Sequence, residues 1–335
     1  MRYLSKTILV LSMLLLLACG RSIEVVQLPS LPGIGLSGLY AGEIAGDLYV
    51  AGGCNFPDKP VTEGGKKAFY NDIWKLSGPS TGSGTGWTSA GKLPQASAYA
   101  AYLATDDGLL IMGGANASGT LDCVWLFDGC KVKELPALPK PLEQAAWCSY
   151  DGAIYLAGGL SGGTPSLEVF KFVDGSWSVA AMLPRPLVQG IACADEGRLN
   201  IFGGFDPVQK EAVKGGYSFL LADGSMSELS ADVTFVGSAA LDGLACGGCN
   251  AEVFTGALNL SAEEVREYQL QPVEYYKFRG QLLEYTLSGW NQVAQHPALA
   301  RAGAALAEYR GGLVSVGGEL KPGIRTPEVW MIKKK

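Results

Sequence analysis

Short apolar runs that end in a pair of glycines recur along the whole chain. Six such runs occur, at residues 49–53, 110–114, 155–159, 200–204, 244–248 and 314–318. Successive doublets are separated by 61, 45, 45, 44 and 70 residues. Self-similarity at a period of this size is typical of repeat architectures such as propellers. The chain is therefore predicted to consist of six copies of one structural unit.

The unit is clearest at residues 143–184, where short apolar segments alternate with turns. Four strands are predicted there, at 145–150, 153–159, 167–172 and 176–184. A repeat of four strands matches one propeller blade, which is a four-stranded sheet. The closing pattern, a strand that ends in Leu-Pro, recurs at residues 87–94 and 132–139.

The two ends of the chain complement each other. The last unit ends after its third strand, at residues 327–335, whereas residues 23–30 form a strand without a blade of its own. We expect the N-terminal strand to complete blade six, because closing the ring removes two free sheet edges. The predicted fold is an all-β, six-bladed β-propeller over residues 19–335, with four antiparallel strands per blade.

Composition narrows the possible functions. The 335 residues contain 46 glycines, carry a net charge of −6 and include one histidine. The absence of a basic face argues against a nucleic acid partner. A single histidine, His296, excludes histidine-rich metal sites, Ser-His-Asp triads and most haem ligation. His296 itself is expected to be structural.

The first residues read as an export signal. Arg2 and Lys6 precede an apolar run at residues 8–17, which is too short to span a membrane and leads to Leu-Ala-Cys. This ending resembles a bacterial lipobox, which implies removal of residues 1–18, lipidation of Cys19 and contact with the membrane only through that lipid. Gly20 favours an outer-membrane anchor with the body in the periplasm.

Seven further cysteines follow Cys19, so at least one thiol remains unpaired. Cys123 could pair with Cys130 across a turn, and Cys246 with Cys249. A redox Cys-x-x-Cys site normally opens a helix, whereas this one follows a strand-like segment. Most of these thiols are expected to be buried small hydrophobes.

Two segments after doublets are unusually long, at residues 54–70 and 249–276. Long loops on a regular scaffold are often functional. Ser261 and Glu264 form a capping-box pattern that predicts a short helix to about residue 268. Because every doublet ends the equivalent strand, both loops and the loop after Gly318 are expected at one mouth of the propeller.

The doublets, with the downstream aromatics Tyr70, Trp74 and Trp87, resemble the kelch repeat over essentially the whole chain. The segment at 317–326, GGELKPGIRT, is similar to the signature of bacterial sialic acid mutarotases (N-acetylneuraminate epimerases), which are periplasmic six-bladed kelch proteins. The segments GGCNFPDKP, EGGKKAFYNDI and GGCNAEVFTG resemble the two long loops of that family. The Glu/Arg loop lies here in the last blade rather than mid-chain, as in a cyclically permuted branch, and a closed ring tolerates such a shift.

The resemblance implies an isomerase that interconverts the anomers of N-acetylneuraminate, an acidic sugar, without a metal or other cofactor. Glu319 is the expected acid/base, since one carboxyl group can shuttle both protons. Arg325 is expected to hold the sugar carboxylate in a bidentate pair, and Pro322-Gly323 to form the turn that joins the two. Further candidate substrate-binding residues are Lys66, Asn55 and Asn250, and Lys67 is expected as a further cation at the same mouth.

Other functions fit the same repeats. A kelch propeller can be a non-catalytic module that binds a carbohydrate or a protein, because fold alone does not decide function. Copper radical oxidases share kelch-like blades but need two histidine ligands, which this chain lacks. A glycosidase would need a second carboxylate roughly 5 to 9.5 Å from Glu319, and Glu63 is the candidate for it.

Overall fold

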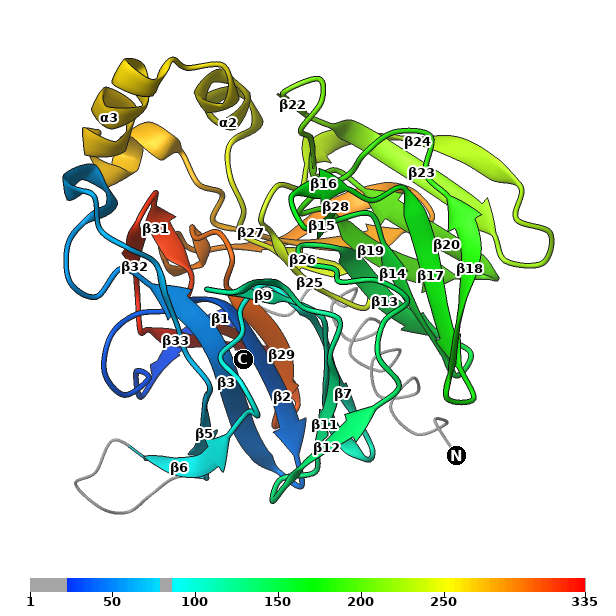
Figure 1. Ribbon diagram of the computed structural model, residues 1–335, viewed down its shortest axis with the longest axis horizontal. Helices are drawn as coiled ribbons and strands as arrows, with labels where there is room; N and C mark the ends of the chain where they lie inside the picture. The colour runs from blue at the N-terminus through cyan, green and yellow to red at the C-terminus, as the bar shows by residue number, and fades with distance from the viewer. Residues whose placement is uncertain (1–22, 79–85, 335) are drawn as a thin grey trace.

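The computed structural model describes residues 23–78 and 86–334, so the predicted signal segment and Cys19 lie outside the described part. Six antiparallel sheets, each built on a path of four strands, surround a common centre (Figure 1). The predicted fold class, an all-β six-bladed propeller, is confirmed.

The blades follow one another in chain order, and each runs from an inner first strand to an outer last strand. Blade one contains β2 (Ser37–Ile44), β3 (Asp47–Asn55), β5 (Asp72–Leu76) and β6 (Trp87–Lys92), with β4 (Ala68–Phe69) paired to β3. Blade two contains β7 (Ala101–Thr105), β8 (Gly108–Met112), β11 (Val124–Phe127) and β12 (Val132–Leu135). Blade three contains β13 (Ala146–Tyr150), β14 (Ala153–Ala157), β17 (Glu168–Val173) and β18 (Ser176–Met182).

The remaining blades repeat this order, and the last one uses both ends of the chain. Blade four contains β19 (Ile191–Asp195), β20 (Arg198–Phe202), β23 (Lys214–Leu220) and β24 (Met226–Thr234). Blade five contains β25 (Ala239–Leu241), β26 (Leu244–Cys246), β27 (Gln281–Thr286) and β28 (Gly289–Gln295). Blade six contains β29 (Ala305–Tyr309), β30 (Gly312–Val316), β33 (Val329–Lys334) and β1 (Ile23–Leu28).

The ring closes through β1. This strand pairs antiparallel with β33, from Ile23 opposite Lys334 to Leu28 opposite Val329. In addition, the inner strand β29 packs beside the inner strand β2, so blade six contacts blade one (Figure 1). The closure of the last blade by the N-terminal strand thus occurs as the sequence predicts.

Burial follows position within the blade. The second strands β8, β14 and β30 are buried at every position, because neighbouring blades cover both of their faces. Outer strands such as β18 are largely exposed. Continuous apolar runs before the doublets therefore mark strands that are covered on two sides, in contrast to the alternating pattern of half-exposed strands.

The doublets mark the place where each second strand leaves its blade. All twelve glycines have positive φ, between 61° and 101°. That region is accessible to glycine at little cost. At Gly158, an added methyl group would also clash with the carbonyl oxygen of Leu187.

Most segments that follow a doublet are short hairpins at one mouth of the propeller. These are β9 (Ala115–Asn116) with β10 (Gly119–Thr120), β15 (Leu160–Ser161) with β16 (Thr164–Pro165), β21 (Phe205–Asp206) with β22 (Glu211–Ala212), and β31 (Glu319–Lys321) with β32 (Ile324–Arg325).

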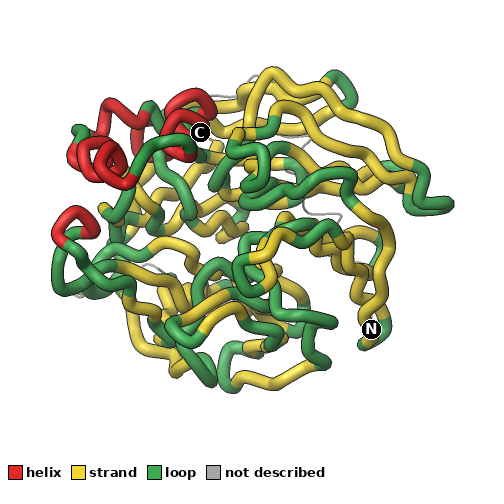
Figure 2. The backbone as a smooth tube through the Cα atoms, turned by 45° about the horizontal axis from the view of Figure 1, so that its top comes forward, coloured by secondary structure: helices red, strands yellow, loops and turns green. Residues whose placement is uncertain are grey.

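Longer segments replace the hairpin in blades one and five. Blade one has the turn η1 (Val61–Glu63), and blade five has α2 (Ala251–Leu258), α3 (Ala262–Leu270) and η2 (Val273–Tyr276). A further turn, η3 (Pro297–Leu299), precedes blade six. The two helices α2 and α3 lie together at one end of the molecule (Figures 1 and 2). In the described part of the chain, no helix is long and apolar enough to cross a membrane.

The predicted helix after Ser261 is confirmed as α3, with both hydrogen bonds of the capping box present. The helix α2 was not predicted from the sequence. It begins at Asn250, whose side chain accepts a hydrogen bond from the Val253 amide. Together the two helices fill the long loop of blade five.

Replacing two glycines with alanine separates the free-energy cost of a left-handed backbone from the cost of a steric clash. Gly175 has a φ of 77° in an open turn, and Gly158 has a φ of 68° beside the Leu187 carbonyl. We expect Gly175→Ala to cost about 1–2 kcal/mol from its left-handed conformation. Gly158→Ala should cost roughly 1–3 kcal/mol more because of the clash. Equal free energies of unfolding for the two variants, measured by urea denaturation, would contradict this account of the doublets.

Candidate functional site

The residues that directly follow the six doublets occupy equivalent places around the mouth. They are Cys54, Ala115, Leu160, Phe205, Cys249 and Glu319. Glu319 is the one charged residue among these six positions. Its backbone is fixed like that of its counterparts, because it forms an antiparallel bridge with Ala302. Blade six therefore presents a carboxyl group where the other blades present apolar or thiol side chains.

Contacts on both sides of Glu319 fix the backbone of its hairpin. Arg301 is 2% exposed, and its Nη1 donates to the Gly317 carbonyl oxygen at 2.9 Å. Its Nη2 forms an ion pair with Glu328 at 3.1 Å. Lys321 donates through Nζ to the carbonyl oxygens of Gln269 and Gln271, at 3.3 and 2.7 Å. The hairpin that carries Glu319 is thus attached both to its own blade and to the helical segment of blade five.

Glu319 and Arg325 lie directly opposite each other on β31 and β32. The turn at Pro322-Gly323 joins the strands, and the Gly323 amide donates to Glu319 Oε1 at 2.7 Å. Arg325 Nη2 lies 3.3 Å from the same oxygen. This hairpin converts the spacing of six residues into a direct contact between the two side chains.

The two side chains differ sharply in exposure. The Glu319 side chain is 25% exposed, and that of Arg325 is 3% exposed. Arg325 donates through Nε to Ser37 Oγ at 2.9 Å, and its guanidinium lies over the Phe56 ring at 4.8 Å. The Arg325 side chain therefore lies behind Glu319, and Arg325 is not among the residues that line the adjoining cavity.

Burial raises the pKa of Glu319 above its usual value, because desolvation disfavours the charged carboxylate. Arg325, the Gly323 amide and Lys67 act in the opposite direction, since each stabilises the negative charge. Burial therefore raises the pKa of the Glu319 carboxyl group, and the buried Arg325 guanidinium limits that rise.

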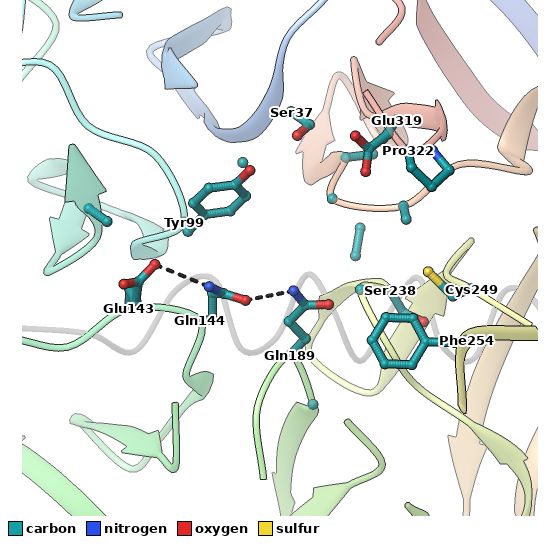
Figure 3. Close-up of a pocket in the computed structure, with 18 of the residues that line it drawn as sticks. Ser37, Tyr99, Glu143, Gln144, Gln189, Ser238, Cys249, Phe254, Glu319 and Pro322 are labelled. Atoms are coloured by element: carbon teal, nitrogen blue, oxygen red, sulfur yellow. Dashed lines mark hydrogen bonds between the residues drawn. The ribbon is translucent and has the colours of Figure 1, made fainter. Parts of the chain in front are cut away.

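Glu319 faces a cavity of about 820 Å³ at the mouth (Figure 3). Its wall combines residues of all six blades. The helical segment of blade five contributes apolar and aromatic side chains, which include Val253, Phe254, Tyr268 and Tyr276. The volume lies within the range of small-molecule sites, about 300–1,000 Å³.

A closed ring of backbone hydrogen bonds lies in the cavity wall. One residue of each blade donates its amide to the carbonyl of its counterpart in the neighbouring blade, at 2.8 to 3.2 Å. All six have φ between 57° and 68°. The ring residues are Gly38, Tyr99, Gln144, Gln189, Gly237 and Gly303.

The structure separates the two candidate lysines of the first long loop. Both lysines are exposed, but Lys67 lines the cavity and Lys66 does not. Lys67 Nζ donates to the Tyr99 hydroxyl at 3.3 Å and lies 5.0 Å from the centre of that ring. Lys67 is thus the lysine that reaches the Glu319 side of the cavity.

The two candidate asparagines also differ. Asn250 lines the cavity but uses its side-chain oxygen to cap α2. Asn55 does not line it, and its side chain bonds the Gly35 carbonyl and the Phe56 amide. Asn55 therefore supports the backbone near Arg325.

The glycosidase alternative needs a second carboxylate near Glu319, and the structure does not place Glu63 in that position. Glu63 is exposed in η1 and does not line the cavity, whereas Glu143 does. Glu143 lies on the wall opposite Glu319 (Figure 3). Both of its oxygens accept hydrogen bonds, from Thr120 at 3.0 Å and from Gln144 at 3.1 Å.

Sequence reasoning missed Tyr99, Glu143, Gln144 and Gln189. A signal for the ring was available, because in five of the six blades the ring residue precedes the first glycine of its doublet by fourteen residues. Blade five shortens this interval to ten. A search for side chains at that offset would have found Tyr99, Gln144 and Gln189.

The buried cysteines and His296 lie in places where they contribute to packing and local hydrogen bonding. All seven described cysteines are free thiols, and four of them are buried: Cys54, Cys148, Cys193 and Cys246. His296 accepts a hydrogen bond from the Ala298 amide through Nδ1 and packs near Trp330. Within the described ranges, no group of three or more His, Cys, Asp or Glu side chains is placed to hold a metal ion.

Comparison with known proteins gives partial sequence matches and a match over the whole fold. No protein-family model matches the chain. The N-acetylneuraminate epimerase of Brucella melitensis is 36% identical over 109 residues, which are 29% of this chain and 26% of that protein. The N-acetylneuraminate epimerase of Yersinia enterocolitica is 32% identical over 102 residues, which are 27% and 26% of the two chains.

The chain thus matches about a quarter of the length of these curated relatives. The solved structure of YjhT superposes with a TM-score of 0.63 over 90% of this chain and 95% of that one, at 12% identity. That likeness establishes the shared fold. One part of the chain is therefore similar to proteins named N-acetylneuraminate epimerase, and the fold is shared with YjhT over nearly its whole length.

Proposed function

We propose that the chain is a mutarotase that interconverts the anomers of N-acetylneuraminate by opening and closing the sugar ring. The observation that carries this proposal is Glu319, a partly exposed carboxyl group with a raised pKa that faces a cavity of about 820 Å³. The names of the partial sequence relatives support the choice of sugar. We further propose that the body lies in the periplasm, anchored through Cys19 to the outer membrane.

The reaction needs one proton carrier. The ionised Glu319 accepts the proton of the anomeric hydroxyl while the bond between the anomeric carbon and the ring oxygen breaks. The same carboxyl group then gives that proton to the ring oxygen, which leaves a neutral open-chain ketose. Rotation about the adjacent carbon–carbon bond exposes the other face of the carbonyl, and the reverse transfers close the ring. A raised pKa suits this role, because a proton carrier works best when its pKa lies near the working pH.

Arg325 has a different role in this proposal from the one that the sequence suggests. The Arg325 side chain is 3% exposed, and its polar contacts are with Glu319 and Ser37. It holds the carboxylate in place and limits the rise of the Glu319 pKa. We therefore assign the sugar carboxylate to Lys67, the lysine on the cavity wall.

Exchange spectroscopy of N-acetylneuraminate tests the proposed reaction. Saturation-transfer NMR with the purified protein should show exchange between the two anomers that is faster than in buffer at the same pH. Binding of the sugar without faster exchange would instead support the non-catalytic alternative, a propeller that binds a carbohydrate. Neither binding nor exchange would remove N-acetylneuraminate as the substrate.

The neighbouring lysines provide a matched test of carboxylate binding. We expect Lys67→Met to raise KM for N-acetylneuraminate about tenfold, as for loss of one charge-assisted hydrogen bond. KM for the uncharged methyl ester should change much less. Lys66→Met removes an identical charge one residue away and should leave both values unchanged. Equal losses for acid and ester in Lys67→Met would rule out the assignment.

A further inference from the structure

Three side chains on the cavity wall opposite Glu319 form one hydrogen-bonded row. Gln189 Nε2 donates to Gln144 Oε1 at 2.6 Å, and Gln144 Nε2 donates to Glu143 Oε2 at 3.1 Å (Figure 3). All three residues line the cavity. They come from the inner ends of blades three and four, far in sequence from the Glu319 hairpin.

The row has a fixed direction. Glu143 also accepts a hydrogen bond from Thr120, whose own oxygen accepts one from the Gly162 amide. An ionised carboxylate accepts but does not donate hydrogen bonds. Gln144 must therefore turn its NH₂ group towards Glu143 and its oxygen towards Gln189. Gln189 in turn uses its NH₂ group for Gln144.

This direction leaves Gln189 Oε1 as the acceptor at the end of the row. No hydrogen bond to this oxygen occurs among the described residues, and it lies over Gly237, where an added Cβ would be 3.4 Å away. The row thus presents a carbonyl oxygen, the counterpart of a donor on a ligand.

The backbone gives an independent indication. Gln144 and Gln189 have φ of 57° and 60°, a conformation that glycine adopts at the equivalent positions of blades one, five and six. A left-handed conformation costs a non-glycine residue about 1–2 kcal/mol. Such strain is concentrated at functional sites. Glycine at these two positions would avoid this conformational free energy, yet glutamine is present at both, and both side chains line the cavity.

The ring is divided into two halves. Its three glycines are consecutive, in blades five, six and one, and they adjoin the Glu319 hairpin of blade six. Its three larger residues, Tyr99, Gln144 and Gln189, occupy the other half. A sugar can therefore lie over the glycine half, with its reacting carbon at Glu319 and its far part towards the glutamines.

We propose that Gln189, oriented by Gln144 and Glu143, forms a second subsite that accepts a hydrogen bond from a donor on the sugar distant from the anomeric carbon. This inference rests on the proposed function and adds a specificity element to it. Three groups of N-acetylneuraminate supply such a donor: the ring 4-hydroxyl, the acetamido N–H and the hydroxyls of the side chain.

The test uses two glycine substitutions in blade four. Gln189→Gly removes the amide and relieves the left-handed backbone. Glu196→Gly makes the same backbone change at an exposed turn outside the cavity, where φ is 47°. Neither variant should unfold at lower urea concentration than the parent, because glycine favours this conformation.

For N-acetylneuraminate, Gln189→Gly should raise KM and the calorimetric Kd about 3- to 10-fold, as for one lost hydrogen bond, with kcat nearly unchanged. Glu196→Gly should match the parent. An analogue with a shortened side chain separates these donors: a penalty that disappears with this analogue assigns the side-chain hydroxyls, and one that persists assigns a substituent of the ring, the acetamido N–H or the 4-hydroxyl.

A Gln189→Gly variant with the parent's KM and Kd would overturn the subsite. Failure of the proposed reaction is recognised separately, by a parent that binds the sugar without accelerating exchange. In that case the Kd comparison still decides the subsite. A parent that does not bind the sugar would contradict both proposals.

Discussion

The closed ring of backbone hydrogen bonds at the mouth fixes the geometry on which the site depends. Each blade donates one amide to a carbonyl of the preceding blade, and the bond from the Gly38 amide to the Gly303 carbonyl closes the ring between blades one and six at 2.8 Å. Such a ring requires six residues in a left-handed conformation, which explains why three are glycine. At the outer edge of the molecule, blade six is completed by the pairing of β1 with β33.

The six blades repeat the same backbone geometry, and the candidate site is formed where equivalent positions carry different side chains. One of the six positions after the doublets carries a carboxyl group, Glu319, and three of the six ring positions carry side chains. A buried ionised carboxylate is costly unless it is paired, and Arg325 behind Glu319 supplies the partner. In the proposed reaction, the balance between burial and this cation lets Glu319 both accept and return a proton.

The sequence predicted the blades, their number and the closing strand, because doublets and strand patterns are local features that recur. It also predicted that the Pro-Gly turn brings Glu319 and Arg325 to one site, and the turn does place them opposite each other on two short strands. It selected Lys66 rather than Lys67 for the substrate, because the directions in which adjacent residues of an irregular segment point depend on tertiary contacts such as the one between Lys67 and Tyr99. The burial of Arg325 and the row from Glu143 to Gln189 depend on how separate blades meet, which local patterns do not encode.

The central claim is that Glu319 alone carries the protons, and the pH dependence of anomer exchange with Glu319→Gln as comparison tests it most directly. Only ionised Glu319 can accept a proton, so the enzyme-dependent rate of the parent should fall on acidification. Because burial raises the pKa of Glu319, the midpoint should lie above 4.5, the usual value for glutamate. Glu319→Gln should show no rate above buffer at any pH. A variant that retains the parent's rate, or a parent whose rate does not fall as Glu319 is protonated, would contradict the account.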